Sequence, residues 1–449
     1  MSPRTLFLGL TIISLLGVSG PTQAVEIKTV TSPSGIKAWL VQDRSIPLIS
    51  MHFIFRDAGA ATDPSGKEGR ANMVSALLDE GAGKFDSQAF QRQLENQSIQ
   101  LNFSVGKDSF GGSLKTLNKY RKSAVKLAAL ALAKPRFDAQ AVARIRAQLL
   151  TGLKARSSRP GYVAGRVWSR AIYGDHVYSR PATGTQKSVV ALKNEDLREY
   201  VSNRLTRDRL IVSVVGDISP EDLKPILDEM FGALPAKGKR STLKKAPIPR
   251  KGAVYVIEKA VPQSVVLFGQ RGIAREDPEF YTAYVLNHIL GGGSFTSRLY
   301  NEVREKRGLA YSVFTYLSPR KKAPLLAGRL STANARVAQS LKVLRAEWQR
   351  LAEHGVDALA LKNAKSFING SFALRFSSSD KIANLLATLQ YYRLGRSYLK
   401  DRKKFINAVS RAKIKKLAKK LLDQSALTVV VVGKPDGVTA SGPAPKVEF

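Results

Sequence analysis

The sequence predicts an α+β protein built from two homologous domains, each an antiparallel-rich sheet covered by helices. Three observations lead to this prediction: a long chain, an internal repeat, and an alternation of strand-like and helix-like segments. The chain has 449 residues, more than a single hydrophobic core usually organises. We therefore expect more than one domain.

The N-terminal 24 residues have the pattern of a secretory signal peptide. Arg4 supplies a positive charge, an apolar run follows from Leu6 to Val18, and Gly20-Pro21 precedes a small-residue cleavage site. The run has about 13 apolar residues, whereas roughly 20 are needed to span a bilayer. We expect the mature chain to begin at Val25, without a transmembrane segment, and the protein to be periplasmic or secreted.

An internal repeat divides the mature chain. The segment Arg209–Asp217 is strand-like and ends in a glycine turn, and it recurs as Leu427–Pro435. Upstream of each copy, a helix-like stretch ends in a Ser-Ser pair at nearly the same offset. Two matches in order at one offset predict a duplication. The predicted domains are residues 25–235 and 252–449, joined by a basic, proline-containing linker over 236–251.

Each half alternates strands and helices. Apolar residues at 49, 51, 53 and 55 alternate with others at 50, 52, 54 and 56, which predicts a half-buried strand. Met73, Val74, Leu77 and Leu78 have helical spacing, and residues 118–153 hold further helical segments. No glycine fingerprint of a dinucleotide site accompanies these strands.

The chain is strongly basic, with a formal net charge of +37 and no cysteine. Lack of cysteine excludes a disulfide framework. The basic residues are scattered, without an aromatic-interleaved patch or a zinc-finger spacing, so we expect no specific nucleic-acid partner. An acidic partner subunit, acidic substrates, an anionic envelope surface and a generally basic proteome all remain open as reasons for the charge.

The histidines exclude a helical zinc site of the usual kind. A zinc hydrolase needs three protein ligands and a carboxylate base, and two of its ligands often lie one helical turn apart. The four histidines, His52, His176, His288 and His354, are far apart in the sequence. We expect them to be structural, with His52 on a strand and His288 in a helix.

Residues 66–81 resemble the zinc-binding helix of the insulinase or pitrilysin family of peptidases, with its ligands replaced. Active members carry His-x-x-Glu-His after Gly-x-Ala, and Gly69-Arg70-Ala71 occupies the latter position here. The family takes its third ligand from a later helix, at the second of two glutamates seven residues apart. The positions that correspond to these five catalytic residues are Asn72, Ser75, Ala76, Ile145 and Gly152.

The second half resembles the signature in the non-zinc half of such enzymes. Leu290–Tyr300 leads into Glu302–Ser312, and a dozen positions agree with the signature in order. In the family, an arginine and a tyrosine seven residues later reach toward the opposed zinc site and contact substrate. The resemblance assigns these roles to Arg304 and Tyr311.

Less specific interpretations stand beside these. In the ordinary case, an arginine such as Arg304 is a solvated helix charge and a tyrosine such as Tyr311 is a packed strand aromatic, although within this signature we favour the functional interpretation. Gly291, Gly292 and Gly293 form either a substrate-contacting loop or a turn that needs positive φ. Asn72 and Ser75 fit a decayed polar helix face.

The resemblance implies a zinc-less subunit and half of a clam-shell peptidase chamber. We expect the chain to pair with a zinc-bearing homologue in a heterodimer that cleaves peptides or unfolded segments. Arg304 and Tyr311 would complete the partner's site, and the zinc would be the partner's. The alternative is a non-enzymatic scaffold or core-type subunit of an envelope complex. A free-standing serine hydrolase has no Gly-x-Ser-x-Gly element to support it.

Overall fold

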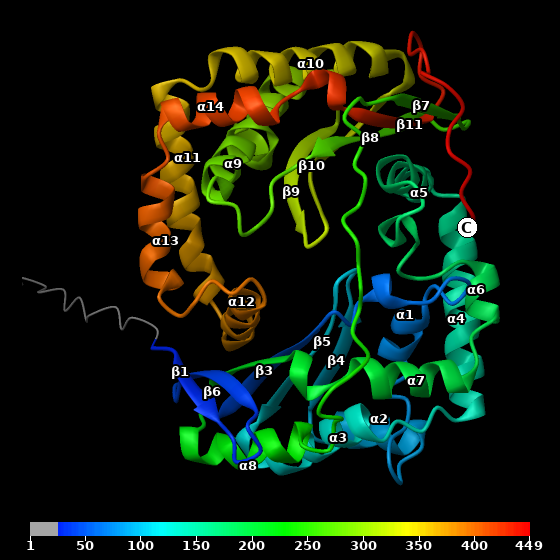
Figure 1. Cartoon of the computed structure of the whole chain (residues 1–449), viewed down its shortest axis with the longest axis vertical. Helices are drawn as coiled ribbons and strands as arrows, with labels where there is room; N and C mark the ends of the chain where they lie inside the picture. The colour runs from blue at the N-terminus through cyan, green and yellow to red at the C-terminus, as the bar shows by residue number, and fades with distance from the viewer. Residues whose placement is uncertain (1–25) are drawn as a thin grey trace, which may run out of the picture.

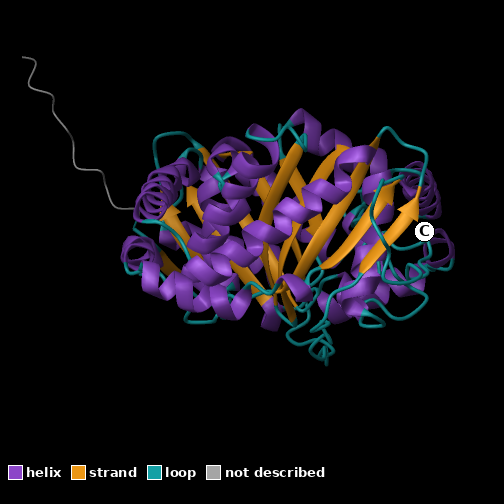
Figure 2. Ribbon diagram, turned by 90° about the horizontal axis from the view of Figure 1, so that it is seen from above, coloured by secondary structure: helices purple, strands orange, loops and turns teal. Residues whose placement is uncertain are grey.

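The computed structural model describes residues 26–449, so the predicted signal peptide lies outside the described residues. Two sheets occupy opposite ends of the molecule, the N-terminal one at the bottom and the C-terminal one at the top of Figure 1. Seen from above, the strands run through the interior and helices surround them (Figure 2). No helix of the described part is long and apolar enough to cross a membrane.

The elements of the N-terminal half are β1 (Lys28–Thr31), β2 (Lys37–Gln42), β3 (Leu48–Arg56), α1 (Arg70–Ser75), α2 (Ser87–Asn96), β4 (Gln100–Val105), β5 (Ser109–Leu117), α3 (Arg121–Ala133), α4 (Ala139–Ser157), α5 (Pro160–Tyr173), α6 (Gln186–Val190), α7 (Asn194–Arg204), β6 (Leu210–Gly216) and α8 (Pro220–Phe231). Those of the C-terminal half are β7 (Val254–Glu258), β8 (Gln263–Arg271), α9 (Phe280–Asn287), β9 (Ser312–Arg320), β10 (Ala323–Ala333), α10 (Val337–His354), α11 (Ala358–Gly370), α12 (Ser379–Tyr391), α13 (Tyr398–Asn407), α14 (Arg411–Leu421) and β11 (Thr428–Gly433).

The two sheets share one topology. The first has the order β1-β2-β6-β3-β5-β4, and the second has the order β7-β11-β8-β10-β9. Apart from β1, the strands correspond one to one, and in each sheet a single parallel pair (β2 with β6, β7 with β11) accompanies antiparallel neighbours. The predicted fold class, α+β with two homologous domains, is confirmed.

The glycines of the repeat close equivalent strands. Gly216 ends β6 with φ 144°, and Gly433 ends β11 with φ 158°. A Cβ at Gly216 would lie 2.2 Å from the carbonyl oxygen of Leu48, and one at Gly433 would lie 2.1 Å from the hydroxyl of Ser264. Both positions need glycine because the neighbouring strand passes too close for a side chain.

One face of β3 forms the core of the N-terminal half. Ile49, Met51, Phe53 and Phe55 are fully buried there, as their alternation predicts. The ring of Phe53 lies edge-on to Phe231 of α8, with centroids 5.6 Å apart. This packing joins the sheet to the helical layer beneath it.

The opposite face of β3 is also covered, which the alternation did not predict. Helix α12, from the C-terminal half, packs on β3 and β6, and Ser50 is fully buried under it. In return, α5 of the N-terminal half packs on β8 and β11 of the second sheet. Figure 1 shows both helices beside the sheet of the other half. Each half therefore contributes one helix that covers the sheet of the other half.

The region between the halves, residues 232–253, contains no helix or strand. It includes the predicted linker, residues 236–251. The exact domain boundaries stay a prediction, since the exchange of α5 and α12 means that each sheet is completed by the other half of the chain.

Candidate functional site

The residues at the zinc-ligand positions on α1 do not together provide a set of metal ligands. The apolar pattern predicts a helix that continues to Leu78, and the apolar residues up to Leu78 are buried. The helix nevertheless ends at Ser75. The hydroxyl of Ser75 donates a 2.7 Å hydrogen bond to the carbonyl oxygen of Asn72. Ala76 is partly buried against the core. The polar group at position 75 is therefore satisfied locally.

Of the two positions on α4, one carries an apolar side chain and the other is a glycine. Ile145 is buried in the hydrophobic core of the N-terminal half. Gly152 has no side chain, and an added Cβ would lie 3.5 Å from a guanidinium nitrogen of Arg156. Among residues 26–449, no group of three or more histidine, cysteine or acidic residues is placed to hold a metal ion. The residues present at the five positions do not fit zinc.

The segment before α1 has a structural role. The Asp63 carboxylate accepts hydrogen bonds of 3.1 Å from the backbone N–H groups of Gly69 and Ala71. The guanidinium of Arg70 lies 3.7 Å from the same carboxylate. Burial raises the pKa of Asp63 to about 7, and Arg70 and the two backbone donors oppose that effect. Gly69 has φ 91°, and a Cβ there would lie 2.8 Å from the carbonyl oxygen of Thr183.

Gly291 and Gly292 lie in a π-helical turn, His288–Gly292, that follows α9, and Gly293 is the residue that caps this turn. None of Gly291, Gly292 and Gly293 has a positive φ, so the interpretation of a turn that needs positive φ is wrong. The positive φ, 50°, belongs to Ser294. A Cβ at Gly291 would lie 2.5 Å from the hydroxyl oxygen of Thr315 on β9. The glycines are needed for close packing.

Arg304 lies in a second π-helical turn, Tyr300–Glu305. Its guanidinium carbon lies 5.0 Å from the centroid of the Tyr300 ring, a cation–π contact. The nearby Glu302 carboxylate is engaged by Lys306 and Arg307, at 2.7 and 2.6 Å. Within the described residues Arg304 forms no ion pair, and it is exposed. Two π-helical turns this close together are typical of functional segments.

Tyr311 stands at the entry to β9 and is 61% exposed. Its backbone N–H donates a 2.9 Å hydrogen bond to the carbonyl oxygen of Ser331 on β10, which fixes the main chain. The expectation of a packed strand aromatic does not hold for this side chain. The exposed Phe295 also lies in the signature, and its ring is edge-on to that of Tyr300.

The arrangement offers a fixed cation and a phenol donor but no complete catalytic set. A guanidinium binds carbonyl or carboxylate oxygens, and a phenol donates a hydrogen bond to developing negative charge. These groups assist a reaction whose nucleophile comes from elsewhere. The structure thus places Arg304 and Tyr311 in one exposed segment of the C-terminal half and the five degenerate positions in the N-terminal half.

A polar cluster between the halves was missed in the sequence. Asp380 of α12 accepts a hydrogen bond from Ser50 at 3.3 Å and lies 2.9 Å from Nε2 of His52. Ser50 and His52 both contact the Asp380 carboxylate, and Ser50 is fully buried. The three residues therefore do not form an accessible nucleophile with a neighbouring base. The signal available in the sequence was the pair of polar residues on one face of β3.

A cavity of about 610 Å³ lies where the turn between β9 and β10 meets the end of β3. Lys321 of this turn pairs with Asp57 of the N-terminal half at 2.8 Å. Arg275 is surrounded by aromatic rings, with its guanidinium carbon 4.2 Å from the Phe280 centroid and 5.1 Å from that of Tyr281. The aromatic enclosure is therefore already filled by a cation of the chain itself.

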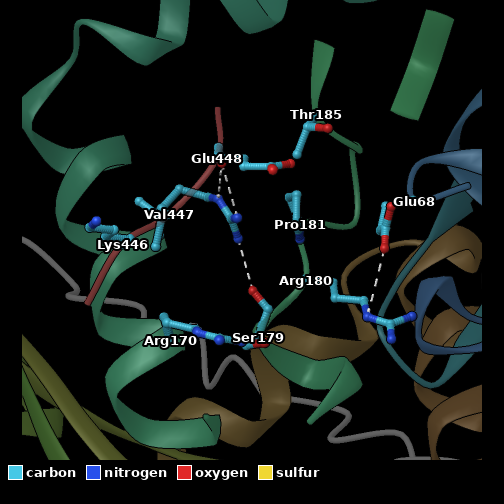
Figure 3. A pocket seen from close by; sticks show the side chains of 10 residues that line it. Glu68, Arg170, Ser179, Arg180, Pro181, Thr185, Lys446, Val447 and Glu448 are labelled. Carbon is cyan, nitrogen blue, oxygen red and sulfur yellow. Dashed lines mark hydrogen bonds and ion pairs between the residues drawn. The ribbon is translucent and has the colours of Figure 1, made fainter. Parts of the chain in front are cut away.

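A second cavity, of about 510 Å³, lies beside the C-terminal segment (Figure 3). Arg166 donates to the carbonyl oxygens of Ser179 and Glu448, at 2.8 and 3.1 Å. Arg180 lies 3.7 Å from the Glu68 carboxylate. Both arginines have partners within the chain, and Arg166 attaches Glu448 of the C-terminal segment to α5 and to the loop that follows it.

Comparison with known proteins shows which family this chain resembles. A family model described as the peptidase M16 inactive domain matches residues 191–367. That stretch contains the signature around Arg304 and Tyr311 and none of the five degenerate positions.

Curated relatives have divided names. The uncharacterized zinc protease YmxG of Bacillus subtilis is 24% identical over 354 residues, which are 79% of this chain and 85% of that protein. The non-peptidase homolog YmxG of Helicobacter pylori is 26% identical over 355 residues, which are 79% of this chain and 81% of that protein.

Solved structures agree with the fold. A crystal structure of a peptidase M16 inactive domain from Pseudomonas fluorescens has a TM-score of 0.86 and 28% identity, covering 94% of this chain and all of that one. A chain of complex III2 from Candida albicans has a TM-score of 0.74 at 16% identity, covering 92% and 96%. The predicted resemblance is confirmed: residues 191–367 match the peptidase M16 inactive domain, and the fold of the chain is similar to that of a solved M16 inactive domain.

Proposed function

We propose that this chain is the non-catalytic subunit of a heterodimeric zinc peptidase, in which Arg304 and Tyr311 complete the site of a zinc-bearing partner. One observation carries the proposal. The zinc positions are replaced by groups that cannot bind metal together, while the signature segment is intact and presents its cation and its phenol to solvent. A chain selected only for packing would have no need to leave both side chains exposed.

The chemistry divides between the subunits. Zinc in the partner would supply a polarised carbonyl and an activated water. The Arg304 guanidinium would bind a carbonyl oxygen of the substrate main chain, and the Tyr311 hydroxyl would donate to the oxyanion of the tetrahedral intermediate. The cation–π contact with Tyr300 and the anchored start of β9 hold the two groups in place.

Peptides are the expected substrates, and the free edge of the second sheet supports this. Strand β9 is the terminal strand of its sheet and begins immediately after Tyr311. It presents Phe314 and Tyr316 on its exposed face. An extended peptide that pairs with this edge would pass Tyr311, so strand addition would deliver it to the proposed site.

A periplasmic or secreted location is part of the proposal. Its support is the signal-peptide pattern of residues 1–24. Under this proposal the zinc-bearing partner carries a signal peptide as well.

The experiment is reconstitution with the nearest homologue that carries His-x-x-Glu-His. Cleavage of a quenched fluorescent peptide is measured for each chain alone and for the mixture, and assembly is followed by analytical ultracentrifugation. We expect activity only in the mixture. Arg304→Ala and Tyr311→Phe should each lower kcat by about 10²-fold without changing assembly, as for the loss of one oxyanion donor.

The matched control is Arg307→Ala, three residues from Arg304 and already paired with Glu302. It should leave kcat within about twofold, since exposed ion pairs contribute little. Full activity of both the Arg304 and Tyr311 variants in an assembled complex would overturn the proposed roles.

A second candidate is a scaffold subunit without a part in cleavage. The similarity in fold to a chain of complex III2 supports it, because the same architecture there belongs to a large assembly. This candidate predicts that no mixture with a zinc-motif homologue cleaves peptides, and that both signature variants assemble and function normally.

A further inference from the structure

One segment of the chain is more basic than the rest, within a distribution of charge that is otherwise scattered. Residues 393–420 contain twelve lysines and arginines and one acidic residue, a net charge of +11 out of the +37 of the whole chain. Eleven of these twelve basic residues are exposed, and Arg402 is the buried exception. The segment spans α13 and α14.

Helix α14 is the most uniform part of this segment. Its apolar residues Ile414, Leu417 and Ala418 are buried in the core of the C-terminal half. The remaining surface carries no acidic residue, and its basic members, here called the α14 cations, are Arg411, Lys413, Lys415, Lys416, Lys419 and Lys420. Within the described residues, the ion pair recorded for them is Lys420 with Glu279, at 3.2 Å.

Such a helix is unfavourable by itself. Like charges four residues apart destabilise a helix by a few tenths of a kcal/mol per pair, and the spacing occurs here between Arg411 and Lys415, Lys415 and Lys419, and Lys416 and Lys420. Burial of the apolar face against α9 and α10 maintains the helix despite the repulsion. Figure 1 shows α14 beside α10 at the outer end of the C-terminal half, away from the sheet of the other half.

We propose that the α14 cations form a docking surface for an anionic lipid bilayer. The apolar side of the helix is already used in the protein core, so it cannot insert, and contact with lipid would be electrostatic. The exposed large apolar residues of the described chain include none in α14. A protein partner would normally bury an apolar centre, which this surface lacks.

The surface also lacks what single-stranded nucleic acid would use. The aromatic residues that pack with α14 are Phe280 and Tyr284, which lie in the hydrophobic cluster around Leu417 and stack on each other, with centroids 6.4 Å apart. Helix α14 itself contains no aromatic residue on which a base could stack. A layer of lipid phosphates requires only closely spaced positive charge, which α14 supplies. This proposal is independent of the proposed peptidase role.

The test compares two variants of equal net charge. The α14 variant combines Lys413→Gln, Lys415→Gln, Lys416→Gln and Lys419→Gln. The control variant combines Lys122→Gln, Lys126→Gln, Lys154→Gln and Lys187→Gln, which are exposed lysines outside α13 and α14. Lysine and glutamine have similar helix propensity, so both should fold, and circular dichroism with an unfolding midpoint checks this. The single variant Lys416→Glu provides a second, less extensive change.

Binding of the mature chain is measured by co-sedimentation with phosphatidylcholine vesicles with and without phosphatidylglycerol. We expect binding only to the anionic vesicles and its loss between about 0.05 M and about 0.5 M salt. A lysine near an anionic leaflet strengthens binding by about fivefold, so the α14 variant should bind at least tenfold more weakly than the control variant. Lys416→Glu should weaken binding several-fold.

Three results would overturn the proposal. The first is no binding to anionic vesicles. The second is equal weakening in the two variants, which would mean that the overall charge and not α14 is responsible. The third is tighter binding to a DNA oligonucleotide than to the vesicles with the same dependence on α14, which would assign the surface to nucleic acid.

Discussion

Leu386 tests whether the exchanged helices make the two halves one cooperative unit. Leu386 belongs to α12, in the C-terminal half of the sequence, and is fully buried against the N-terminal sheet. Its cluster is small, containing Val41, Val215, Ile382 and Ala383. Leu386→Ala removes three carbon atoms, which correspond to about 2.4 kcal/mol of transfer free energy at about 0.8 kcal/mol each. The cavity left behind adds to this, so we expect a loss of about 3 kcal/mol.

The assay is equilibrium unfolding in urea, observed at two tryptophans. Trp39 packs beside the α12 cluster, and Trp348 lies in the core of the C-terminal half. Variants that keep only one of these two tryptophans, and that also lack the third tryptophan, Trp168, report on each half separately. Because α12 connects the halves, we expect the midpoint to fall equally at both reporters.

Leu374→Ala is the matched control, since that leucine is 70% exposed and precedes α12 in the same half. It should change stability by less than about 0.5 kcal/mol. A loss below about 1 kcal/mol for Leu386→Ala would refute the packing argument. A shift seen at Trp39 alone would show that the halves unfold independently.

Three further predictions concern the site and the contact between the halves. Tyr311→Phe should leave the unfolding midpoint of the chain unchanged within about 0.5 kcal/mol, because the hydroxyl is exposed; a larger loss would mean that it is structural. Asn72→His combined with Ala76→His should retain no zinc after dialysis against a chelator, measured by mass spectrometry, because the third-ligand position is a glycine; one bound equivalent would contradict this. Partial burial raises the pKa of Asp380, but the hydrogen bond and charge of His52 outweigh that effect and lower it below the usual value. The carboxylate therefore contributes stability above its unfolded pKa of about 4, and this contribution is lost as the pH falls through the lower folded value. Asp380 is half exposed, so its contribution to stability is below about 1 kcal/mol. Asp380→Asn should reduce the difference in unfolding midpoint between about pH 3 and about pH 7. An unchanged difference would show that the contact between Asp380 and His52 does not stabilise the fold.

Local patterns predicted much of the fold. The alternation along β3 identified its buried face, because a strand side chain points to one side or the other with a period of two. The same pattern was read as a half-buried strand, and that was incomplete. Whether the polar face meets water depends on α12, which arrives from more than 320 residues away in the sequence, as the separation of 328 between His52 and Asp380 shows.

The sequence supplies the candidate site residues, which stay a prediction, but not their structural setting. The loss of the zinc ligands could be read directly, since histidine is required and none is present between residues 53 and 175. The shortness of α1 and the π-helical turns depend on hydrogen bonds that no spacing rule specifies. The role of Gly291 was misread because its neighbour, Thr315, lies on a different element.

The sequence by itself determined the family resemblance, the duplication and the replacement of the zinc-motif residues, because these depend on which side chains exist and in what order. Only the tertiary structure decided which surfaces are left free. It buried Ser50 under α12, exposed Tyr311, and turned the apolar side of α14 inward so that its cations face out. Burial depends on what packs against a residue, and for these three the packing partners are distant segments of the chain.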